Sequence, residues 1–403
     1  MSFTRASVRR ELDYSGLFVE LLSGEVGFRG ARRVYNLCPT PSASVAVAAT
    51  KTITVAAGST IVFSMGAGTG RITFTGTSGA TGTLDANASS RTAATLSGLS
   101  AGTVIATASV ATCVDLQFED VTGQANQNPS EYVSVGVLSS PFHGAMVDGV
   151  KWFDYENPNI VVGNVVQEIT GVPVPRIPYP QVLRGYTPMP AATNILTYSG
   201  DLTNAAWTKA ASVASIATYP PRLLKESLPS QLRDDATAAS IHGMFRNPTV
   251  TANTNYCAWL VVHSSGERFR GRIGFLDAAT SSNGVICEFN ARTGVTNAAA
   301  IGTGTLAGSG YIHVAKGWGI VYVSGKIDAA TTAAQVQFLM ADSAGNLVYD
   351  GDGVSRMILG HFQLETGIVP TNIIPTTSAA VTVQADVMSL TLATPAAMSA
   401  SYV

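Results

Sequence analysis

Apolar and polar residues alternate along most of this chain, and the alternation has a period of two. The pattern is clearest in KTITVAAGSTIVFSMGAGTGRITFTGTSGATGTLDA, residues 51–86, where glycines separate short apolar runs. A period of two is typical of half-buried strands, and glycines at this spacing are typical of hairpin turns. Residues 36–135, named module 1 below, are therefore predicted to form an antiparallel β-sandwich of short strands.

Residues 194–390, named module 2 below, repeat this pattern and are predicted to form a second antiparallel β-sandwich. The strand-like runs include NYCAWLVVHSS, GVICEFNA, YIHVAKGWGIVYVSGKI and AAQVQFLMADS, again separated by Gly and Asn. One segment differs, because PPRLLKESLPSQLRDDA (220–236) lacks the alternation and predicts one or two helical turns that end before Pro229. The predicted fold class is all-β, with two sandwich modules in tandem.

Three further segments complete the predicted domain organisation. Residues 1–35 form an N-terminal docking arm, whose apolar residues include Leu12, Tyr14, Leu17, Phe18, Val19, Leu21 and Leu22. Such a short stretch cannot bury these side chains alone, so the arm is predicted to contact another chain. Residues 136–193 form an aromatic and Pro-rich connector, because its prolines disfavour helix and central strand. Residues 391–403 form a C-terminal tail.

A short motif occurs near the end of each module. Gln117-Phe118-Glu119 is followed by Pro129-Ser130-Glu131-Tyr132-Val133, and Gln363-Leu364-Glu365 is followed by Pro370-Thr371-Asn372-Ile373-Ile374. Internal similarity of this kind indicates two copies of one domain. Glu119 and Glu365 are therefore predicted to occupy equivalent places in the last strands, with the proline ending the strand pairing.

Composition and charge narrow the function classes. Charged residues make up 12% of the chain and the net charge is −2, whereas about 25% charged residues is usual. The absence of a basic stripe argues against a nucleic-acid partner. No signal peptide and no membrane-spanning apolar run is visible in the sequence. The four cysteines, which lack C-x-x-C spacing, are predicted to be buried free thiols: Cys38, Cys113, Cys257 and Cys287.

Several segments resemble a module found in tailed-bacteriophage virion proteins. NILTYSGDLTNAAWTKA (194–210) resembles its opening, and Gly351-Asp352-Gly353, Gln363-Leu364-Glu365 and VPTNIIPTTSAAVTVQADV (369–387) resemble its end. Other segments resemble the links between such modules in phage tail or head appendages: FTRAS (3–7), FRGARRVYNL (28–37), PFHGAMVDGVKWFD (141–154), VVQEITG (165–171) and LRGYTP (183–188). The resemblance implies jelly-roll-like modules, a fold that includes carbohydrate binders.

The resemblance also implies a function. It favours a non-enzymatic virion structural protein, a tail-fibre, appendage or decoration component assembled in the bacterial host cytoplasm. The implied partners are portal, tail or capsid proteins, and the usual state of phage fibres implies a homotrimer. The alternative is a receptor-binding module that binds host-surface glycan, which requires an exposed aromatic patch with polar groups around it.

Aromatic residues of module 2 are the candidates for a glycan site. Trp207, Trp259 and Trp318 fall in strand-like runs, so their first interpretation is core packing and the second is stacking on a sugar ring. Tyr311 and Tyr349 are the alternative sugar contacts, and both are expected in loops.

No catalytic, cofactor or metal site is predicted. Asp350 and Asp352 lie two residues apart in YDGDGVS, but Val354 and His361 stand where an EF-hand needs oxygen ligands. A Gly-Asp-Gly turn is therefore predicted there, with a looser calcium site as the alternative. The histidines show no metal-ligand spacing: His143, His242, His263, His313 and His361. The sequence also lacks phosphate-loop, dinucleotide and nucleophile-elbow motifs, and the long repeats of a β-helical depolymerase.

Overall fold

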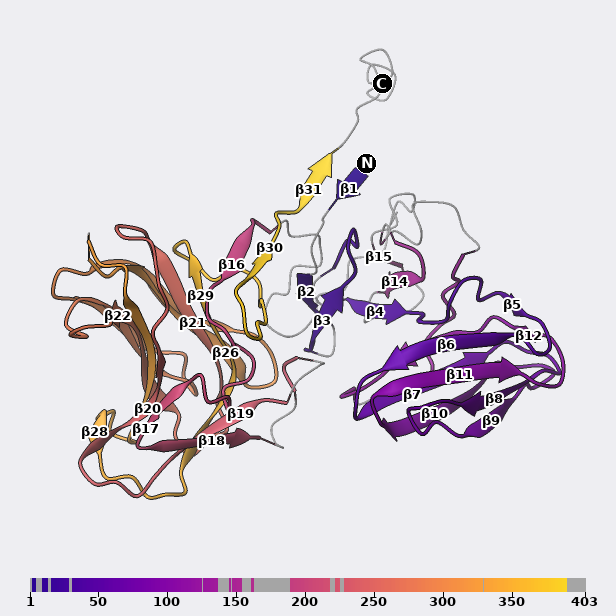
Figure 1. Ribbon diagram of the computed structural model, residues 1–403, viewed down its shortest axis with the longest axis horizontal. Helices are drawn as coiled ribbons and strands as arrows, with labels where there is room; N and C mark the ends of the chain where they lie inside the picture. Colours follow the sequence, from indigo (N-terminus) through magenta and orange to yellow (C-terminus); the bar gives the residue numbers. More distant parts are fainter. Residues whose placement is uncertain are drawn as a thin grey trace, which may run out of the picture. The chain divides into compact units, whose positions relative to one another are not determined.

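The computed structural model describes residues 2–4, 9–13, 16–28, 31–124, 126–136, 145, 147–153, 161–162, 189–217, 222–224, 228–328 and 330–389. All regular secondary structure in these ranges is β-strand, and the sheets are antiparallel (Figure 1). The predicted fold class, all-β with tandem antiparallel sandwiches, is confirmed. The chain divides into two compact units, one comprising Met1–Glu11, Gly16–Ser23 and Pro188–Val403, and the other Leu12–Ser15 and Gly24–Thr187.

Module 1 lies in the second of these units and contains three small sheets. The first joins β10 (Thr92–Leu99), β7 (Ser59–Met65) and β13 (Gln117–Asp120). The second joins β6 (Thr50–Val55), β11 (Gly102–Ala108), β8 (Arg71–Thr75) and β9 (Gly82–Asp85). The third pairs β12 (Cys113–Val114) with β5 (Ser44–Val45).

The core of module 1 is formed by alternate residues of these strands. In β11, Val104 and Ala106 are buried while their neighbours are half-buried, as the period of two predicts. The Phe63 ring lies 4.5 Å from Phe74 and 4.8 Å from Phe118, measured between ring centroids. These aromatic contacts join β7 to β8 and β13, so strands from two sheets meet in one core.

Module 2 is a larger sandwich of two sheets. One has the order β17 (Thr208–Ala210), β20 (Ser240–Arg246), β27 (Ala334–Ala341), β22 (Arg270–Asp277), β23 (Gly284–Asn290) and β24 (Thr296–Ile301), and β28 (Val348–Tyr349) also pairs with β20. The other has the order β18 (Ser212–Ile216), β19 (Ser230–Asp234), β29 (Arg356–Thr366), β21 (Tyr256–His263), β26 (Trp318–Lys326) and β25 (Thr305–His313).

The central strands of module 2 are buried more completely than those of module 1. Every residue of β21 is buried, which explains why its sequence YCAWLVVH is a nearly continuous apolar run without alternation. Strand β29, its neighbour, is buried from Met357 to Glu365. The shared core contains Leu260, Phe275 and Phe338.

Four small sheets complete the described strands. They pair β16 (Ala192–Asn194) with β30 (Val381–Val383), β1 (Ser2–Thr4) with β31 (Val387–Ser389), β2 (Arg9–Leu12) with β3 (Phe18–Leu21), and β14 (Val150–Phe153) with both β4 (Arg32–Tyr35) and β15 (Val161–Val162). The predicted connector thus contains strand at 150–153, whereas its prolines from 173 to 188 lie outside the described residues.

Two parts of the N-terminal segment, Met1–Glu11 and Gly16–Ser23, belong to the same compact unit as module 2, whereas Leu12–Ser15 and Gly24–Thr187 belong to the other unit. Phe18 forms an isolated parallel bridge with Leu224, and its backbone N–H donates to the carbonyl of Leu223 at 2.9 Å. The side-chain amide of Asn372 donates to the carbonyl of Arg10 at 2.8 Å. Leu21 is fully buried. The apolar residues Leu12, Leu17, Phe18, Val19 and Leu21 are therefore buried within this chain and do not form an exposed cluster, and contact of the arm with another chain stays a prediction.

Two further sequence predictions concern the helical turns before Pro229 and the state of the four cysteines. The helical turns expected before Pro229 are wrong where the residues are described, because Leu224 lies in a β-bridge and residues 222–224 and 228 are not helical. After Pro229, Ser230–Asp234 form β19, which pairs with β18 and β29. The prediction of buried free thiols is confirmed at Cys38, Cys113, Cys257 and Cys287.

The repeated Gln-x-Glu motif makes equivalent hydrogen bonds in the two modules. In module 1, Gln117 Oε1 accepts from Val133 N at 2.6 Å, Glu119 Oε1 accepts from Ser130 N at 2.9 Å, and Gln117 Nε2 donates to Glu119 at 2.7 Å. The motif strand is thereby fixed to the segment that follows the proline. We call this arrangement the Gln-Glu clasp.

The same clasp occurs in module 2. Gln363 Oε1 accepts from Ile374 N at 2.9 Å, Glu365 Oε1 accepts from Thr371 N at 2.8 Å, and Gln363 Nε2 donates to Glu365 at 3.0 Å. These donors are the residues that align with Val133 and Ser130 in the sequence. The predicted equivalence of the two motif glutamates is confirmed by this pattern.

An asparagine completes each clasp, and the motif comparison did not identify it. The side-chain amides of Asn36 and Asn194 donate at 2.8 Å to the carbonyls of Val133 and Ile374. Each asparagine oxygen also accepts from the backbone N–H of the residue between Gln and Glu. A buried asparagine with all these bonds holds three chain segments in one register.

Candidate functional site

The three tryptophans of module 2 are core residues. Trp207, Trp259 and Trp318 are 1%, 0% and 2% exposed. Trp259 Nε1 donates to Glu365 Oε1 at 2.8 Å, and the Trp207 ring stacks on Phe362 with 5.4 Å between centroids. The core interpretation is confirmed, because a ring with no exposed face cannot stack on a sugar.

The two tyrosines considered as sugar contacts also make internal contacts. Tyr311 lies in β25 instead of a loop, is half-buried, and donates its hydroxyl to the carbonyl of Ala291 at 3.1 Å. Burial raises the pKa of Tyr311 to about 12. Tyr349 lies in β28, is 8% exposed, and its ring is covered by the guanidinium of Arg268 at 4.6 Å. The Tyr349 ring therefore presents no open face, and the Tyr311 ring is half-buried.

The Gly-Asp-Gly loop considered as a calcium site is held by protein groups. Asp352 Oδ1 accepts from the backbone N–H groups of Val354 at 2.8 Å and Ser355 at 2.6 Å, as expected for a side-chain-stabilised turn. Arg268 Nη2 lies 2.6 Å from Asp234 Oδ2 and 3.5 Å from Asp352 Oδ2. The hydroxyl and N–H of Ser355 lower the pKa of Asp352, whereas burial raises the pKa of Asp234. The guanidinium thus supplies the positive charge between these carboxylates.

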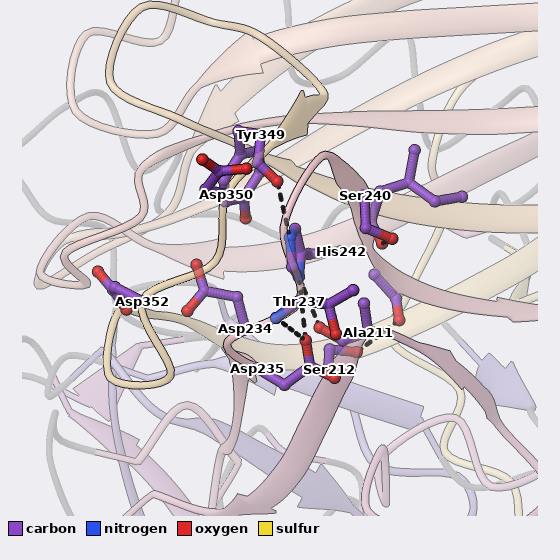
Figure 2. A network of polar contacts seen from close by, with 12 residues as sticks. Ala211, Ser212, Asp234, Asp235, Thr237, Ser240, His242, Tyr349, Asp350 and Asp352 are labelled. Carbon is purple, nitrogen blue, oxygen red and sulfur yellow. Dashed lines mark hydrogen bonds and ion pairs between the residues drawn. The ribbon is translucent and has the colours of Figure 1, made fainter.

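Further contacts fix this loop to the sheets of module 2, as Figure 2 shows around His242. His242 Nδ1 lies 2.6 Å from the carbonyl oxygen of Ala211, and Nε2 lies 3.2 Å from that of Tyr349. Asp350 Oδ1 accepts from the backbone N–H of Ala239 at 2.7 Å. The network therefore has a structural role, joining the loop before β29 to the segments beside β18, β19 and β20.

The histidines do not converge on a metal site within the described ranges. No group of three or more His, Cys, Asp or Glu side chains suited to a metal ion occurs there. His242, His263 and His361 are buried, His313 is exposed, and His143 lies outside the described residues. No helix in the described part of the chain is long and apolar enough to cross a membrane.

A cavity of about 370 Å³ lies on the seven-stranded sheet of module 2, where β22 begins and β23 ends. Arg270 of β22 lines it together with Glu288 and Asn290 of β23. The remaining lining residues come largely from the β23–β24 hairpin and the turn after β27: Gly271, Phe289, Thr293, Val295, Thr296, Asn297, Ala341, Gly345 and Leu347. We call this depression the β22–β23 cavity.

Arg270 and Glu288 line the cavity, Arg272 lies beside it two residues after Arg270, and all three point away from the core. Ile273 and Phe275 of β22 belong to the core, so Arg270 and Arg272, at alternate positions, lie on the outward face of the sheet. The same alternation places Glu288 outward on β23, directly across from Arg272 in the strand register. Arginine and glutamate thus form a polar row across two neighbouring strands.

The outward face beside the cavity is closely packed. Gln337 and Leu339 of β27 lie on it by strand alternation and are nevertheless only 7% and 3% exposed. Glycines occupy adjacent places, because a Cβ at Gly274 would lie 3.1 Å from the Gln337 side chain and one at Gly243 would lie 2.7 Å from Leu339. The low exposure of Gln337 and Leu339 and the short distances at these glycines indicate tight packing, so the depression is limited to the residues that line the β22–β23 cavity.

The positive charges of Arg270 and Arg272 on this face are not neutralised by direct contact with a described carboxylate. The side chains of Arg270 and Arg272 make no hydrogen bond or ion pair with another described residue, and the Nε atom of each is buried without an acceptor. Burial lowers the pKa of Arg272, and the nearby charge of Glu288 opposes that effect. By contrast, the side chain of Arg268, two residues before β22, is paired with Asp234.

Sequence reasoning did not identify this cavity, although one signal was present. The stretch RFRGR places arginines at 268, 270 and 272, every second residue, so all three share one side of an extended chain. Which of them is neutralised depends on Asp234, which is distant in the sequence.

No family model matches the chain, and no curated protein matches it. Similar solved structures include the tandem CBM22-1–CBM22-2 domain of Paenibacillus barcinonensis Xyn10C, with 9% identity and a TM-score of 0.27, covering 90% of this chain and 99% of that one. TmCBM61 in complex with β-1,4-galactotriose has 11% identity and a TM-score of 0.25, covering 43% and 99%. The enzymatically active domain of bacteriophage CBA120 tailspike protein 4 has 10% identity and a TM-score of 0.26, covering 44% and 21%.

Proposed function

We propose that this protein is a non-catalytic binding protein that recognises polysaccharide at the β22–β23 cavity. The observation that carries the proposal is the cavity itself, whose size of about 370 Å³ lies near the lower end of ligand pockets, which span about 300–1,000 Å³. Arg270, Glu288 and Asn297 offer guanidinium, carboxylate and amide groups there. Such donors and acceptors match the hydroxyl groups of sugars.

The chemistry of the cavity supports binding without turnover. Glu288 is the single acidic residue among those that line it. Glycoside hydrolysis commonly requires two carboxyl groups about 5 to 9.5 Å apart, one of which protonates the leaving group. With one carboxylate, the cavity can orient a sugar but lacks the second group of the usual hydrolytic pair.

A glycan array tests this proposal, followed by calorimetric titration of a retained glycan against the full chain. Asn297→Ala and Glu288→Ala should each weaken binding about fivefold, since each removes a hydrogen-bonding group worth about 1 kcal/mol. Glu267→Ala is the matched control, because Glu267 is exposed, lies outside the cavity and pairs with Arg356 at 3.5 Å. Retention of no glycan of any kind would contradict the proposal.

A second candidate function is a structural component of a phage virion. Its support is the set of segments that resemble phage appendage modules, chiefly 194–210 and 369–387. In this proposal the chain assembles with portal, tail or capsid proteins and forms a homotrimer. Light scattering would measure the number of chains, and location of the protein on an intact particle would test its place. A particle-bound protein that also retains glycan would join both functions in a receptor-binding component.

A further inference from the structure

Two arginines beside the cavity carry charge that the described chain does not neutralise. Arg270 and Arg272 occupy alternate positions of β22 and lie on the outward face of its sheet, whereas Arg268 precedes the strand. Arg268 donates to Asp234 through Nε at 2.9 Å and Nη2 at 2.6 Å. Arg270 and Arg272 have no comparable acceptor among the described residues.

The environment of these two side chains makes the missing acceptor significant. Both are half-buried, and the Nε of each is shielded from solvent. A partly buried cation without an acceptor destabilises the folded state, since it has lost water contacts and gained no partner. A loss of folding stability of this kind is typical of a binding surface whose partner comes from outside the chain.

Acidic residues near the arginines leave this charge available. Glu288 faces Arg272 across the strands, but it forms no ion pair within 4 Å and is exposed. Asp342 follows β27, and its Oδ1 accepts from the backbone N–H groups of residues 344, 345 and 346. The first carboxylate is hydrated and the second stabilises its own turn, so neither binds a guanidinium directly.

We infer that the ligand of the β22–β23 cavity is an anionic polysaccharide, whose sugar carboxylate binds Arg270 and Arg272. The inference rests on the proposed polysaccharide-binding function and specifies its substrate class. Guanidinium groups match carboxylates because two parallel N–H groups reach the two oxygens together. The two arginines lie about 7 Å apart along the strand, from a rise of about 3.4 Å per residue, so one carboxylate can contact both side chains.

Matched sugar pairs test the inference. The full chain is titrated calorimetrically with oligogalacturonate, oligomannuronate and hyaluronan oligomers, and with the carboxyl-reduced form of each. At least one acidic oligomer should bind tenfold or more tightly than its reduced form, and its affinity should fall as salt rises. A chondroitin sulfate oligomer is titrated alongside its desulfated form. Binding that requires the sulfate groups would identify a sulfate-specific site and overturn the carboxylate assignment.

Arginine variants connect the affinity to these two residues. Arg270→Gln and Arg272→Gln should each lose about tenfold in affinity for the acidic oligomer and leave any binding of the reduced form unchanged. Arg356→Gln is the matched control, because Arg356 is exposed and lies in the other sheet. Arg270→Lys and Arg272→Lys keep the charge and should recover part of the loss. Thermal melts of each variant establish that it is folded.

The possible failures can be distinguished. Equal binding of acidic and reduced oligomers, or unchanged affinity in both glutamine variants, would overturn the anionic inference while polysaccharide binding stands. Binding to none of the oligomers, together with an empty glycan array, would overturn both proposals.

Discussion

The Gln-Glu clasp occurs in both modules, yet its carboxylate has different neighbours in each. Glu365 of module 2 is fully buried and accepts hydrogen bonds from Trp259, Gln363 and Thr371. Glu119 of module 1 is 6% exposed and accepts from the side chain of Gln117 and the backbone of Ser130. The backbone contacts are common to both copies, whereas the surroundings of the carboxylate differ.

The difference begins at the neighbouring strand. In module 2 the register places Trp259 opposite the motif glutamine, and in module 1 it places Ser64 there. The hydroxyl of Ser64 accepts from Arg91, whose guanidinium lies 5.0 Å from the centre of the Tyr132 ring. An indole donor in one copy is thus replaced by an arginine and a tyrosine in the other. A duplicated fold can keep its register while the groups around a buried charge change.

The largest expected effect comes from removing the two carboxylates. Glu365→Ala should lower the free energy of unfolding of module 2 by about 4 kcal/mol, because it leaves several buried donors without an acceptor. Glu119→Ala should cost module 1 about 2 kcal/mol, since fewer donors lose their partner. Urea unfolding measures both, with tryptophan fluorescence following module 2.

The control for this pair is Glu288→Ala, which removes an exposed carboxylate and should change stability by less than about 0.5 kcal/mol. Equal losses for Glu365→Ala and Glu119→Ala would show that the difference in surroundings has no energetic consequence.

A second prediction concerns pH, because the two clasps differ in a neighbouring histidine. His361 Nε2 lies 3.0 Å from Gln363 Oε1 in module 2, and Asp115 stands at the corresponding place before Gln117. Burial lowers the pKa of His361 to about 4. The neutral ring stabilises the fold fully above an unfolded pKa of about 6.5, and this contribution declines toward pH 4 by about 3 kcal/mol.

Comparison of the wild type with His361→Gln isolates this contribution. Unfolding is measured between pH 4 and 7, and the variant should lose less module 2 stability on acidification. Burial raises the pKa of Glu365, whose protonation acts in the opposite direction, and both proteins retain that effect. Parallel pH profiles for the two proteins would count against a neutral buried His361.

The third prediction concerns the indole N–H of Trp259, a hydrogen-bond donor that has no counterpart in module 1. Trp259→Phe deletes the indole N–H that binds Glu365 and part of a fully buried ring. Module 2 should lose about 2 kcal/mol, from one charge-assisted hydrogen bond and a small cavity. Chemical unfolding measures the loss, followed by circular dichroism. The same measurement on Phe63→Leu in module 1 gives the packing effect without a lost donor, and an equal loss there would assign the Trp259 effect to packing.

The smallest expected changes in stability come from replacing two half-buried arginines, one in each module. Arg91→Met in module 1 should cost about 1 kcal/mol, because Arg91 donates to Ser64 and lies over Tyr132. Arg272→Met in module 2 should leave stability within about 0.5 kcal/mol or raise it, since no acceptor is lost. Differential scanning calorimetry measures both. A marked loss in Arg272→Met would indicate that this arginine serves the fold and would weaken the inference of an external anion.

The sequence by itself determined the fold class, the duplicated motif and the core role of the tryptophans. These properties follow from local patterns, because alternation with period two specifies which residues share a face. The pairs Ile61/Phe63 and Ile72/Phe74 illustrate this, since all four are buried as the alternation predicts. The clasp was visible because both copies retain glutamine, glutamate and proline in the same order.

Only the tertiary structure decided which polar groups are paired. The charge of Arg268 is neutralised by Asp234, 34 positions earlier, whereas Arg270 and Arg272 remain without an acceptor. The same long-range pairing gives the Asp352 loop a guanidinium neighbour. Strand pairing likewise replaced the helical turns expected before Pro229 at Leu224, which forms a β-bridge with Phe18. Local sequence specifies the direction of a side chain, but the partner it meets depends on which distant strand the sheet brings beside it.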